Sequence, residues 1–191
     1  LTISDQLIVV TNAITVDTAN DLAATTTGKI TATIDPTETV GELATLSADG
    51  GTNELTITIR SEDATAATAG QLNTINAATA TAVNLTNVTA LAASSLADLG
   101  TLATAISNDE FSNATGLTTI AVSDGTVDAT TLAARIDSYD TINGDGATTG
   151  MTLAAGATIN VDADEVAHML ADETGGRLTI SDQLIVVTNA I

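Results

Sequence analysis

The segment at residues 140–146 (DTINGDG) contains the side chains best suited to hold a metal ion. It places Asp140, Asn143 and Asp145 close together with two glycines. Calcium takes six or more oxygen ligands, and glycines allow backbone carbonyls to contribute. The segment lacks the EF-hand pattern and that of calcium-binding nonapeptide rolls, and ordinary turn chemistry explains the same residue types. Asp140, Asn143 and Asp145 are therefore candidate calcium ligands. We expect that the protein requires no cofactor, and that calcium is the ion it would bind if it binds one.

Residues typical of catalysis are scarce in the sequence. His168 is the only histidine, there is no cysteine, and no GxSxG nucleophile motif occurs. We interpret His168, within a short helical stretch, as a surface or interface residue rather than a general base. The sequence therefore predicts no catalytic residues and no enzymatic activity.

Three N-glycosylation sequons begin at Asn84, Asn87 and Asn113. Such matches arise often in a threonine-rich chain, and the adjacent pair is not expected to be modified at both sites. Surface glycans are therefore an open alternative among the partners of this protein.

The charge balance excludes several partners. The 191 residues include 24 acidic and 4 basic side chains, for a formal net charge of −20. Binding to nucleic acid or to anionic membranes depends on Lys and Arg, so neither partner is expected. No run of 18 apolar residues is present, so we expect no insertion into a membrane. The expected small partners are cations.

The composition also limits how a core could be built. The chain has no cysteine or tryptophan, one tyrosine and one phenylalanine, and it is rich in threonine and alanine. Aromatic residues usually bury the largest areas, so this core must consist of many small contacts. Repeat proteins are assembled in that way.

The most informative feature is an exact repeat. Residues 1–14 and 178–191 both read LTISDQLIVVTNAI, at an offset of 177. We interpret residues 1–177 as one period of a longer tandem array and residues 178–191 as the start of the next identical period. Because the second copy adds only Asp182, one period carries a net charge of −19. A covalent array and a non-covalent polymer both remain open.

A weaker repeat lies inside the period. Short strand-like segments with a polar residue after them begin at residues 1, 14, 30, 55, 83, 117, 158 and 178. These define seven units of 13 to 41 residues. The shortest units have room for a strand and one helical turn, and the longest for three or more turns and a loop.

Helical spacing follows several of these strands. Leu96, Leu99 and Leu102 recur on one helical face, and residues 40–46, 72–78, 128–136 and 164–170 have similar spacing. Asp35 followed by Pro36 resembles a helix start, as does Asp128. The sequence therefore predicts an α/β-solenoid of about seven coils, with a stack of parallel strands and short helices or turns in each coil. The alternative is a β-solenoid with little helix.

Segments such as LTITIRSEDATAATAGQLNTI (residues 55–75) and LTTIAVSDGTVDATTLAARI (residues 117–136) resemble the tandem-repeat regions of giant bacterial extracellular proteins, including adhesins, S-layer-like proteins and surface filaments. The resemblance covers the whole chain but is compositional. It implies an extracellular, cell-surface or secreted location and a structural role, and it transfers no functional residue.

These observations predict a structural repeat of an extracellular filament or giant surface protein, forming an elongated acidic rod by end-to-end stacking on identical copies. In that arrangement we expect the strand at Leu178 to continue the sheet from the strand at Thr158. The alternative function is a calcium-stabilised, RTX-like adhesin repeat that presents a ligand-binding face.

Overall fold

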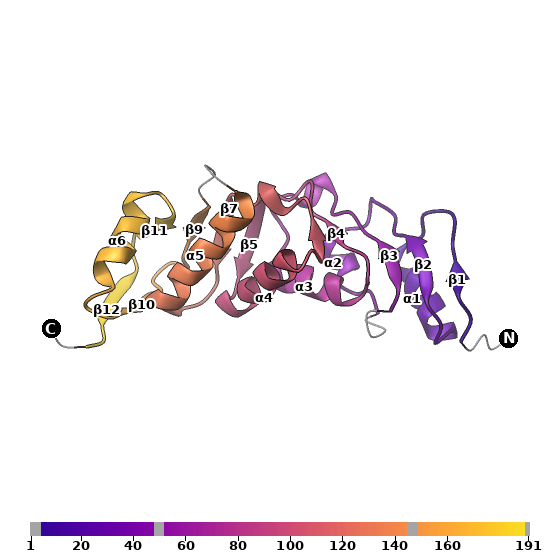
Figure 1. Ribbon diagram of the computed structural model, residues 1–191, viewed down its shortest axis with the longest axis horizontal. Coiled ribbons are helices and arrows are strands. Elements are labelled where there is room, and N and C mark those ends of the chain that lie inside the picture. Colours follow the sequence, from indigo (N-terminus) through magenta and orange to yellow (C-terminus); the bar gives the residue numbers. More distant parts are fainter. Residues whose placement is uncertain (1–4, 48–51, 145–148, 190–191) are drawn as a thin grey trace.

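The computed structural model shows an elongated molecule with its two termini at opposite ends (Figure 1). It describes residues 5–47, 52–144 and 149–189. Asp145, one of the candidate calcium ligands, lies outside these residues. The described part is a mixed α/β arrangement of six α-helices and short parallel strands in four small sheets.

The α-helices follow one another along the long axis of the molecule (Figure 1). Neighbouring helices from α2 to α6 contact one another in sequence order. Their bounds are α1 Val16–Thr25, α2 Val40–Leu43, α3 Ala69–Ala77, α4 Leu96–Ser107, α5 Ala129–Asn143 and α6 Val166–Thr174.

Side-chain caps fix where several of these helices begin. Asp128 accepts a hydrogen bond from the Thr131 amide at 3.0 Å, which confirms it as the N-cap of α5. Thr39 and Thr68 form capping boxes at α2 and α3. The predicted cap at Asp35 is wrong, because that carboxylate accepts from the Thr37 amide within a turn before α2. The helix start lies four residues later than the Asp-Pro pair suggested.

All paired strands run parallel. The sheets have the orders β1-β2-β3, β4-β6, β5-β7-β9-β11 and β8-β10-β12. Their bounds are β1 Ile8–Val9, β2 Ile30–Thr33, β3 Glu54–Thr56, β4 Val83–Asn84, β5 Ala90–Ser94, β6 Phe111–Ser112, β7 Thr119–Val122, β8 Thr126–Asp128, β9 Gly150–Thr152, β10 Thr158–Val161, β11 Leu178–Thr179 and β12 Leu184–Val187. From β7 onward, successive strands alternate between two sheets.

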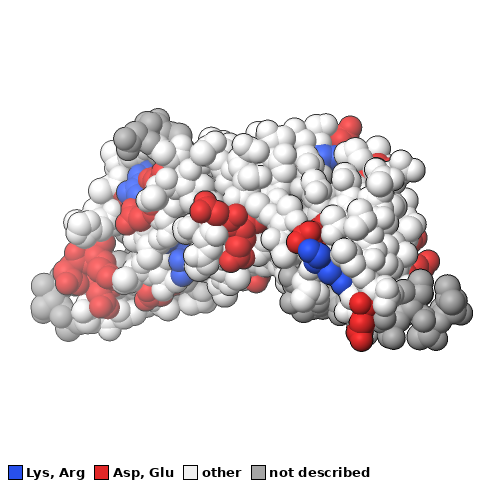
Figure 2. Space-filling view, turned by 45° about the vertical axis from the view of Figure 1, so that its right-hand side comes forward, with Lys and Arg blue, Asp and Glu red and all other residues white. Residues whose placement is uncertain are grey.

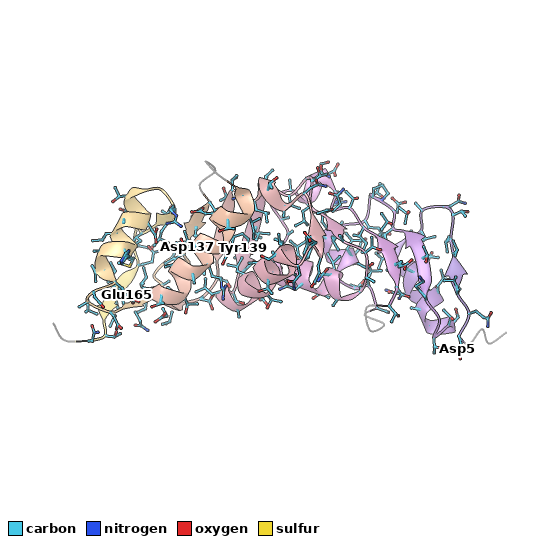
Figure 3. All side chains as sticks on the ribbon, viewed as in Figure 1. Asp5, Asp137, Tyr139 and Glu165 are labelled. Carbon is cyan, nitrogen blue, oxygen red and sulfur yellow. The ribbon has the colours of Figure 1, made fainter. Side chains whose placement is uncertain are left out.

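One hydrophobic core runs through the molecule, built mainly from Leu, Ile, Val and Ala. The two aromatic residues are also buried in it: Phe111 on β6 and Tyr139 on α5. The Tyr139 hydroxyl donates a hydrogen bond to the Leu99 carbonyl at 3.1 Å, which joins α5 to α4; Figure 3 labels Tyr139 on its helix. Burial raises the pKa of Tyr139 well above its ordinary value, so the phenol stays neutral and remains a donor.

The expectation of a solenoid with seven coils is wrong. The strands form four separate sheets rather than one stack, and more than one strand separates the later helices: three strands lie between α4 and α5, and two between α5 and α6. Helices pack at axis distances of about 8–10 Å and strands at about 4.8 Å. Because the units range from 13 to 41 residues, they cannot all combine these helix and strand spacings in the same way.

The alternative with little helix is wrong as well, since the helices reach 15 residues in α5. The expectation that short units hold a single helical turn also fails. The unit of 16 residues beginning at Ile14 contains α1, which is 10 residues long. Thr15 caps α1 by accepting from the Thr18 amide at 3.2 Å, so the helix begins almost immediately after the bridge that Ile14 forms with Ile34.

Candidate functional site: the two terminal strands

The C-terminal copy of the repeated segment, described over residues 178–189, contains the edge strand β12 at one end of the molecule (Figure 1). This strand runs parallel to β10, in register from the pair Thr158–Leu184 to the pair Val161–Val187. Its other edge has no partner strand in the described structure. The prediction that the strand at Leu178 continues the sheet from the Thr158 strand is therefore wrong, because the strand at Leu178 pairs with β9 and it is β12 that pairs with β10.

Backbone hydrogen bonds show which edge of β12 is used. The amides of Leu184 and Thr188 donate to carbonyls on the β10 side at 2.9 and 3.0 Å. Successive residues of a strand direct their backbone groups to opposite edges. The amide of Val186 therefore also faces β10, whereas those of Ile185 and Val187 face away from it, toward the open edge.

The N-terminal copy, described over residues 5–14, contains the edge strand β1 at the opposite end (Figure 1). It runs parallel to β2. The amides of Ile8 and Val10 donate to the carbonyls of Lys29 and Thr31, both at 2.9 Å. By the same alternation, the amide of Val9 faces the open edge.

The two copies therefore use opposite edges of the same peptide. With the offset of 177, Ile8 corresponds to Ile185 and Val10 to Val187. These positions bind β2 in the N-terminal copy and face the open edge in the C-terminal copy. One strand of this sequence could consequently pair with β10 on one edge and with β2 on the other without sharing a hydrogen bond.

The side chains agree with this double pairing. Ile185 is opposite Ile159 in the β10–β12 pair, and Ile8 is opposite Ile30 in the β1–β2 pair. Ile159 and Ile30 are both fully buried in the core. The same isoleucine of the segment is thus aligned with a core residue on each side.

Polar contacts on the two sides also use different atoms. The Asn189 side-chain oxygen accepts from the Ala163 amide at 2.8 Å, and the Gln6 carbonyl accepts from the Thr26 hydroxyl at 3.1 Å. The aspartate of the segment forms side-chain contacts in both copies. Asp5 binds Thr27 through Oδ1 and has a left-handed backbone (φ 58°), whereas its counterpart in the C-terminal copy accepts from Gly156 through Oδ2.

Both terminal strands expose large apolar side chains. Leu7 and Val9 are 60% and 61% exposed, and Leu184 and Val187 are 61% and 50% exposed. Within the described residues, the exposed large apolar side chains are confined to these two segments and to Leu170 on α6. Contiguous exposed apolar surface commonly marks an interaction site. The repeat was visible in the sequence, but its two different pairing partners were not.

The structure places the described part of the predicted calcium site at the end of α5. The Asp140 carboxylate binds the Arg177 Nε at 2.6 Å and the Thr149 amide at 2.9 Å. The Asn143 side-chain amide donates to the Leu117 carbonyl at 2.5 Å. Calcium binding through Asp140, Asn143 and Asp145 remains a prediction. Among the residues that the structure describes, no three acidic or histidine side chains form a metal-binding cluster.

Arg177 instead organises the carboxylates in this region. It forms ion pairs with Asp137, Asp140 and Asp172, the last at 2.7 Å, and so joins α5 to α6. Burial lowers the pKa of Arg177, but hydrogen bonds to Asp137 and Asp140 outweigh it and hold this pKa above its ordinary value. Of the candidate calcium ligands, the guanidinium contacts Asp140, through Oδ2.

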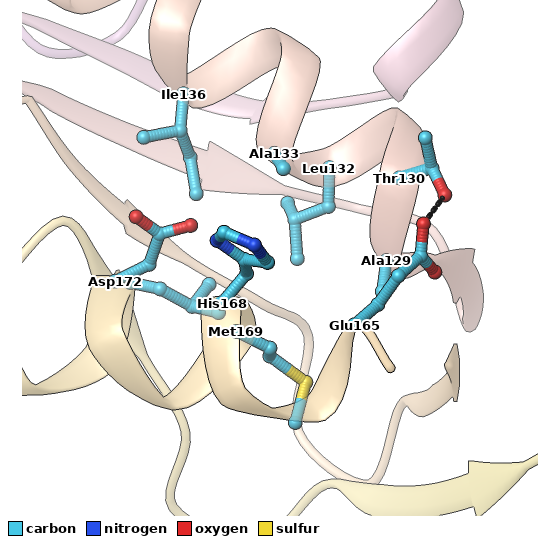
Figure 4. Close-up of a pocket in the computed structure, with 10 residues that line it drawn as sticks. Ala129, Thr130, Leu132, Ala133, Ile136, Glu165, His168, Met169 and Asp172 are labelled. Atoms are coloured by element: carbon cyan, nitrogen blue, oxygen red, sulfur yellow. Dashed lines mark hydrogen bonds between the residues drawn. The ribbon is translucent and has the colours of Figure 1, made fainter. Parts of the chain in front are cut away.

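A cavity between two helices offers little room for a ligand. A cavity of about 200 Å³ lies between α5 and α6, where His168 and Asp172 on α6 face Leu132 and Ile136 on α5 (Figure 4). Glu165 closes one side by accepting from the Thr130 hydroxyl at 2.5 Å. Ligand sites usually measure about 300–1,000 Å³, so this cavity is small for a substrate.

The asparagine side chains of the predicted sequons form hydrogen bonds within the protein. The Asn87 side-chain amide donates to the Ile59 carbonyl at 2.8 Å. The Asn113 amide donates to the Asn84 side-chain oxygen at 3.0 Å. Attachment of a glycan to Asn87 or Asn113 would compete with these hydrogen bonds, and glycosylation remains a prediction.

The basic side chains are largely used within the molecule. Lys29 pairs with Glu54 at 2.7 Å and Arg60 with Asp63 at 2.9 Å, while Arg177 binds the carboxylates described above. The face seen in Figure 2 accordingly shows its basic side chains as small patches, most of them beside acidic ones. No helix in the described part of the chain is both long and apolar enough to cross a bilayer.

Comparisons with known proteins add no functional assignment, since no family model, curated protein or solved structure matches this chain.

Proposed function

We propose that this chain is a structural repeat of an extracellular filament or giant cell-surface protein, and that it forms an elongated acidic rod by end-to-end continuation. The observation that carries the proposal is the complementary use of the repeated segment. It pairs with β10 through one edge at one end of the molecule and with β2 through the other edge at the other end. A single copy of this strand then joins two successive periods.

The composition supports the same role. A net charge of −20 with most basic groups engaged internally gives a surface that repels other copies sideways. Apolar side chains are exposed mainly at the two ends of the long axis. Attraction is therefore concentrated at the ends, which favours a linear assembly.

This proposal predicts that the 191-residue chain associates end to end in a salt-dependent way. The Debye length falls from about 30 Å at 0.01 M to about 3 Å at 1 M ionic strength, so added NaCl screens repulsion while apolar pairing persists. We expect association to tighten on the order of tenfold, equivalent to about 1.4 kcal/mol. Light scattering gives the mass, and small-angle X-ray scattering shows whether the particle grows along one axis only.

Growth in cross-section rather than in length, or a strictly monomeric chain at high concentration and high salt, would contradict the proposal. Sodium chloride and tetramethylammonium chloride at equal ionic strength provide the control for specific cation binding, because both screen charge equally.

A further inference from the structure

The junction between two periods has room for one copy of the repeated segment, whereas two separate chains bring two copies to it. β12 of one chain has an open edge that matches β2. The same edge of β2 in the next chain is already occupied by β1, which has the identical sequence. Both copies cannot occupy that position together.

We propose that separate chains join by strand exchange, in which residues 182–189 of one chain displace residues 5–12 of the next from the edge of β2. The partner of this surface is therefore a second copy of the same chain. This inference rests on the proposed end-to-end assembly and specifies its route.

The exchange conserves the contacts of β2. Ile185 and Val187 of the incoming strand replace Ile8 and Val10, so the hydrogen bonds to Lys29 and Thr31 are re-formed with the same residue types. The side-chain pair with Ile30 is likewise re-formed. The second copy adds the pairing of β12 to β10, which β1 lacks. The incoming strand is thus bonded on both edges, and the open edge of β12 disappears.

The register of the joined sheet is fixed by the two existing pairs. Val186 of one chain, opposite Asn160 of its own β10, takes the place of Val9 opposite Thr31 of the next chain. Val9 is 61% exposed and Thr31 is partly exposed, so both side chains lie on the outer face. Adjacent parallel strands lie about 4.8 Å apart, within the Cα separation that a disulfide spans. The chain has no cysteine of its own, so engineered pairs are unambiguous.

The test is a reversible lock. A chain with Val9→Cys and Thr31→Cys can form an internal disulfide that holds β1 on β2. Under the salt conditions in which the parent chain associates, we expect the oxidised variant to remain monomeric in light scattering. Reduction should restore association to within about twofold of the parent.

A second pair of variants checks the register. Mixing a Thr31→Cys chain with a Val186→Cys chain should give a disulfide-linked dimer on oxidation. A Thr33→Cys chain, displaced by two residues on the same strand, provides the mismatched control and should give at least tenfold less.

The outcomes separate the two proposals. If the oxidised lock associates as strongly as the reduced form, strand exchange is wrong while end-to-end assembly stands. If neither form associates at any salt concentration, both proposals are wrong. Equal cross-linking of Val186→Cys with Thr31→Cys and Thr33→Cys also overturns the proposed register.

Discussion

Replacing Val187 with proline is expected to weaken end-to-end association strongly while leaving the single chain folded. In β12 the hydrogen bonds to β10 come from the amides of Leu184 and Thr188, with Val186 between them by alternation, and the Val187 amide faces the open edge. Proline removes that amide hydrogen, and it is tolerated at strand edges where the N–H faces solvent. In the joined sheet the same amide must donate to Thr31 of the next chain.

The expected loss is substantial. One ladder hydrogen bond contributes about 1 kcal/mol, and the proline ring also meets the facing strand. Association should therefore weaken by at least about tenfold. Circular dichroism and thermal melting of the dilute chain verify that its fold is retained, and light scattering at high salt measures the association.

Proline at Val9 is the matched control. The Val9 amide faces the open edge of β1, so this substitution also spares the pairing within the chain. Strand exchange removes β1 from the junction, and Val9→Pro should therefore associate as well as the parent. Loss of association in Val9→Pro would contradict strand exchange, whether Val187→Pro is unaffected or equally impaired. It would mean that the neighbouring chain adds to the outer edge of β1 instead.

Gly28→Ala is the second substitution with a large expected effect. A Cβ at this position would lie 2.2 Å from the Gln6 carbonyl oxygen and 2.8 Å from its amide nitrogen, so the terminal segment must move. Overpacking of this kind costs about 1–3 kcal/mol. We expect the amides of Ile8 and Val10 to exchange with solvent about tenfold faster or more, because the N-terminal copy detaches from β2.

The same substitution should also block assembly, because Gln183 of an incoming strand corresponds to Gln6 and meets the same Cβ. Gly125→Ala is the control, since a Cβ there meets no atom within 4 Å. Hydrogen exchange followed by mass spectrometry and light scattering can be applied to both variants. Normal assembly of Gly28→Ala would show that the neighbouring chain does not occupy the position of β1.

Local structure was the part of the fold most open to prediction from the sequence. The leucine spacing at residues 96–102 predicted α4, and Asp128 was recognised as the cap of α5. The capping threonines Thr39 and Thr68 were not predicted, although both begin a Thr-x-x-Glu/Gln capping box. Threonine is so common in this chain that a threonine at the start of such a motif does not stand out from the rest of the sequence.

The sheets could not be predicted in the same way. Parallel strands find their partners across helices and loops, so the sequence around β9 or β11 does not say which sheet it joins. Strands as short as Val83–Asn84 have no periodicity to recognise. The solenoid prediction assumed one strand for each unit. It is wrong because successive strands from β7 onward alternate between two sheets.

Only part of the candidate site could be predicted from the sequence. Sequence comparison of the chain with itself located the repeated segment, but it could not assign an edge to each copy, because the two copies are identical. The edge that each copy uses is set by the neighbouring strand, which is β2 for the N-terminal copy and β10 for the C-terminal copy. Asp140 is another residue whose partner could not be predicted from its neighbours in the sequence. It was predicted as a calcium ligand, and its carboxylate binds Arg177 from another part of the chain.

The most direct test of the shared strand is residue-resolved hydrogen exchange on a chain in which the 177-residue period is duplicated. Such a chain contains an internal copy of the segment between two periods and a terminal copy like the present β12. We predict that the internal counterparts of Ile185 and Val187 are protected, together with those of Leu184 and Val186. In the terminal copy, only the amides facing β10 should be protected. Rapid exchange of the internal Ile185 and Val187 counterparts, as in the terminal copy, would contradict the account.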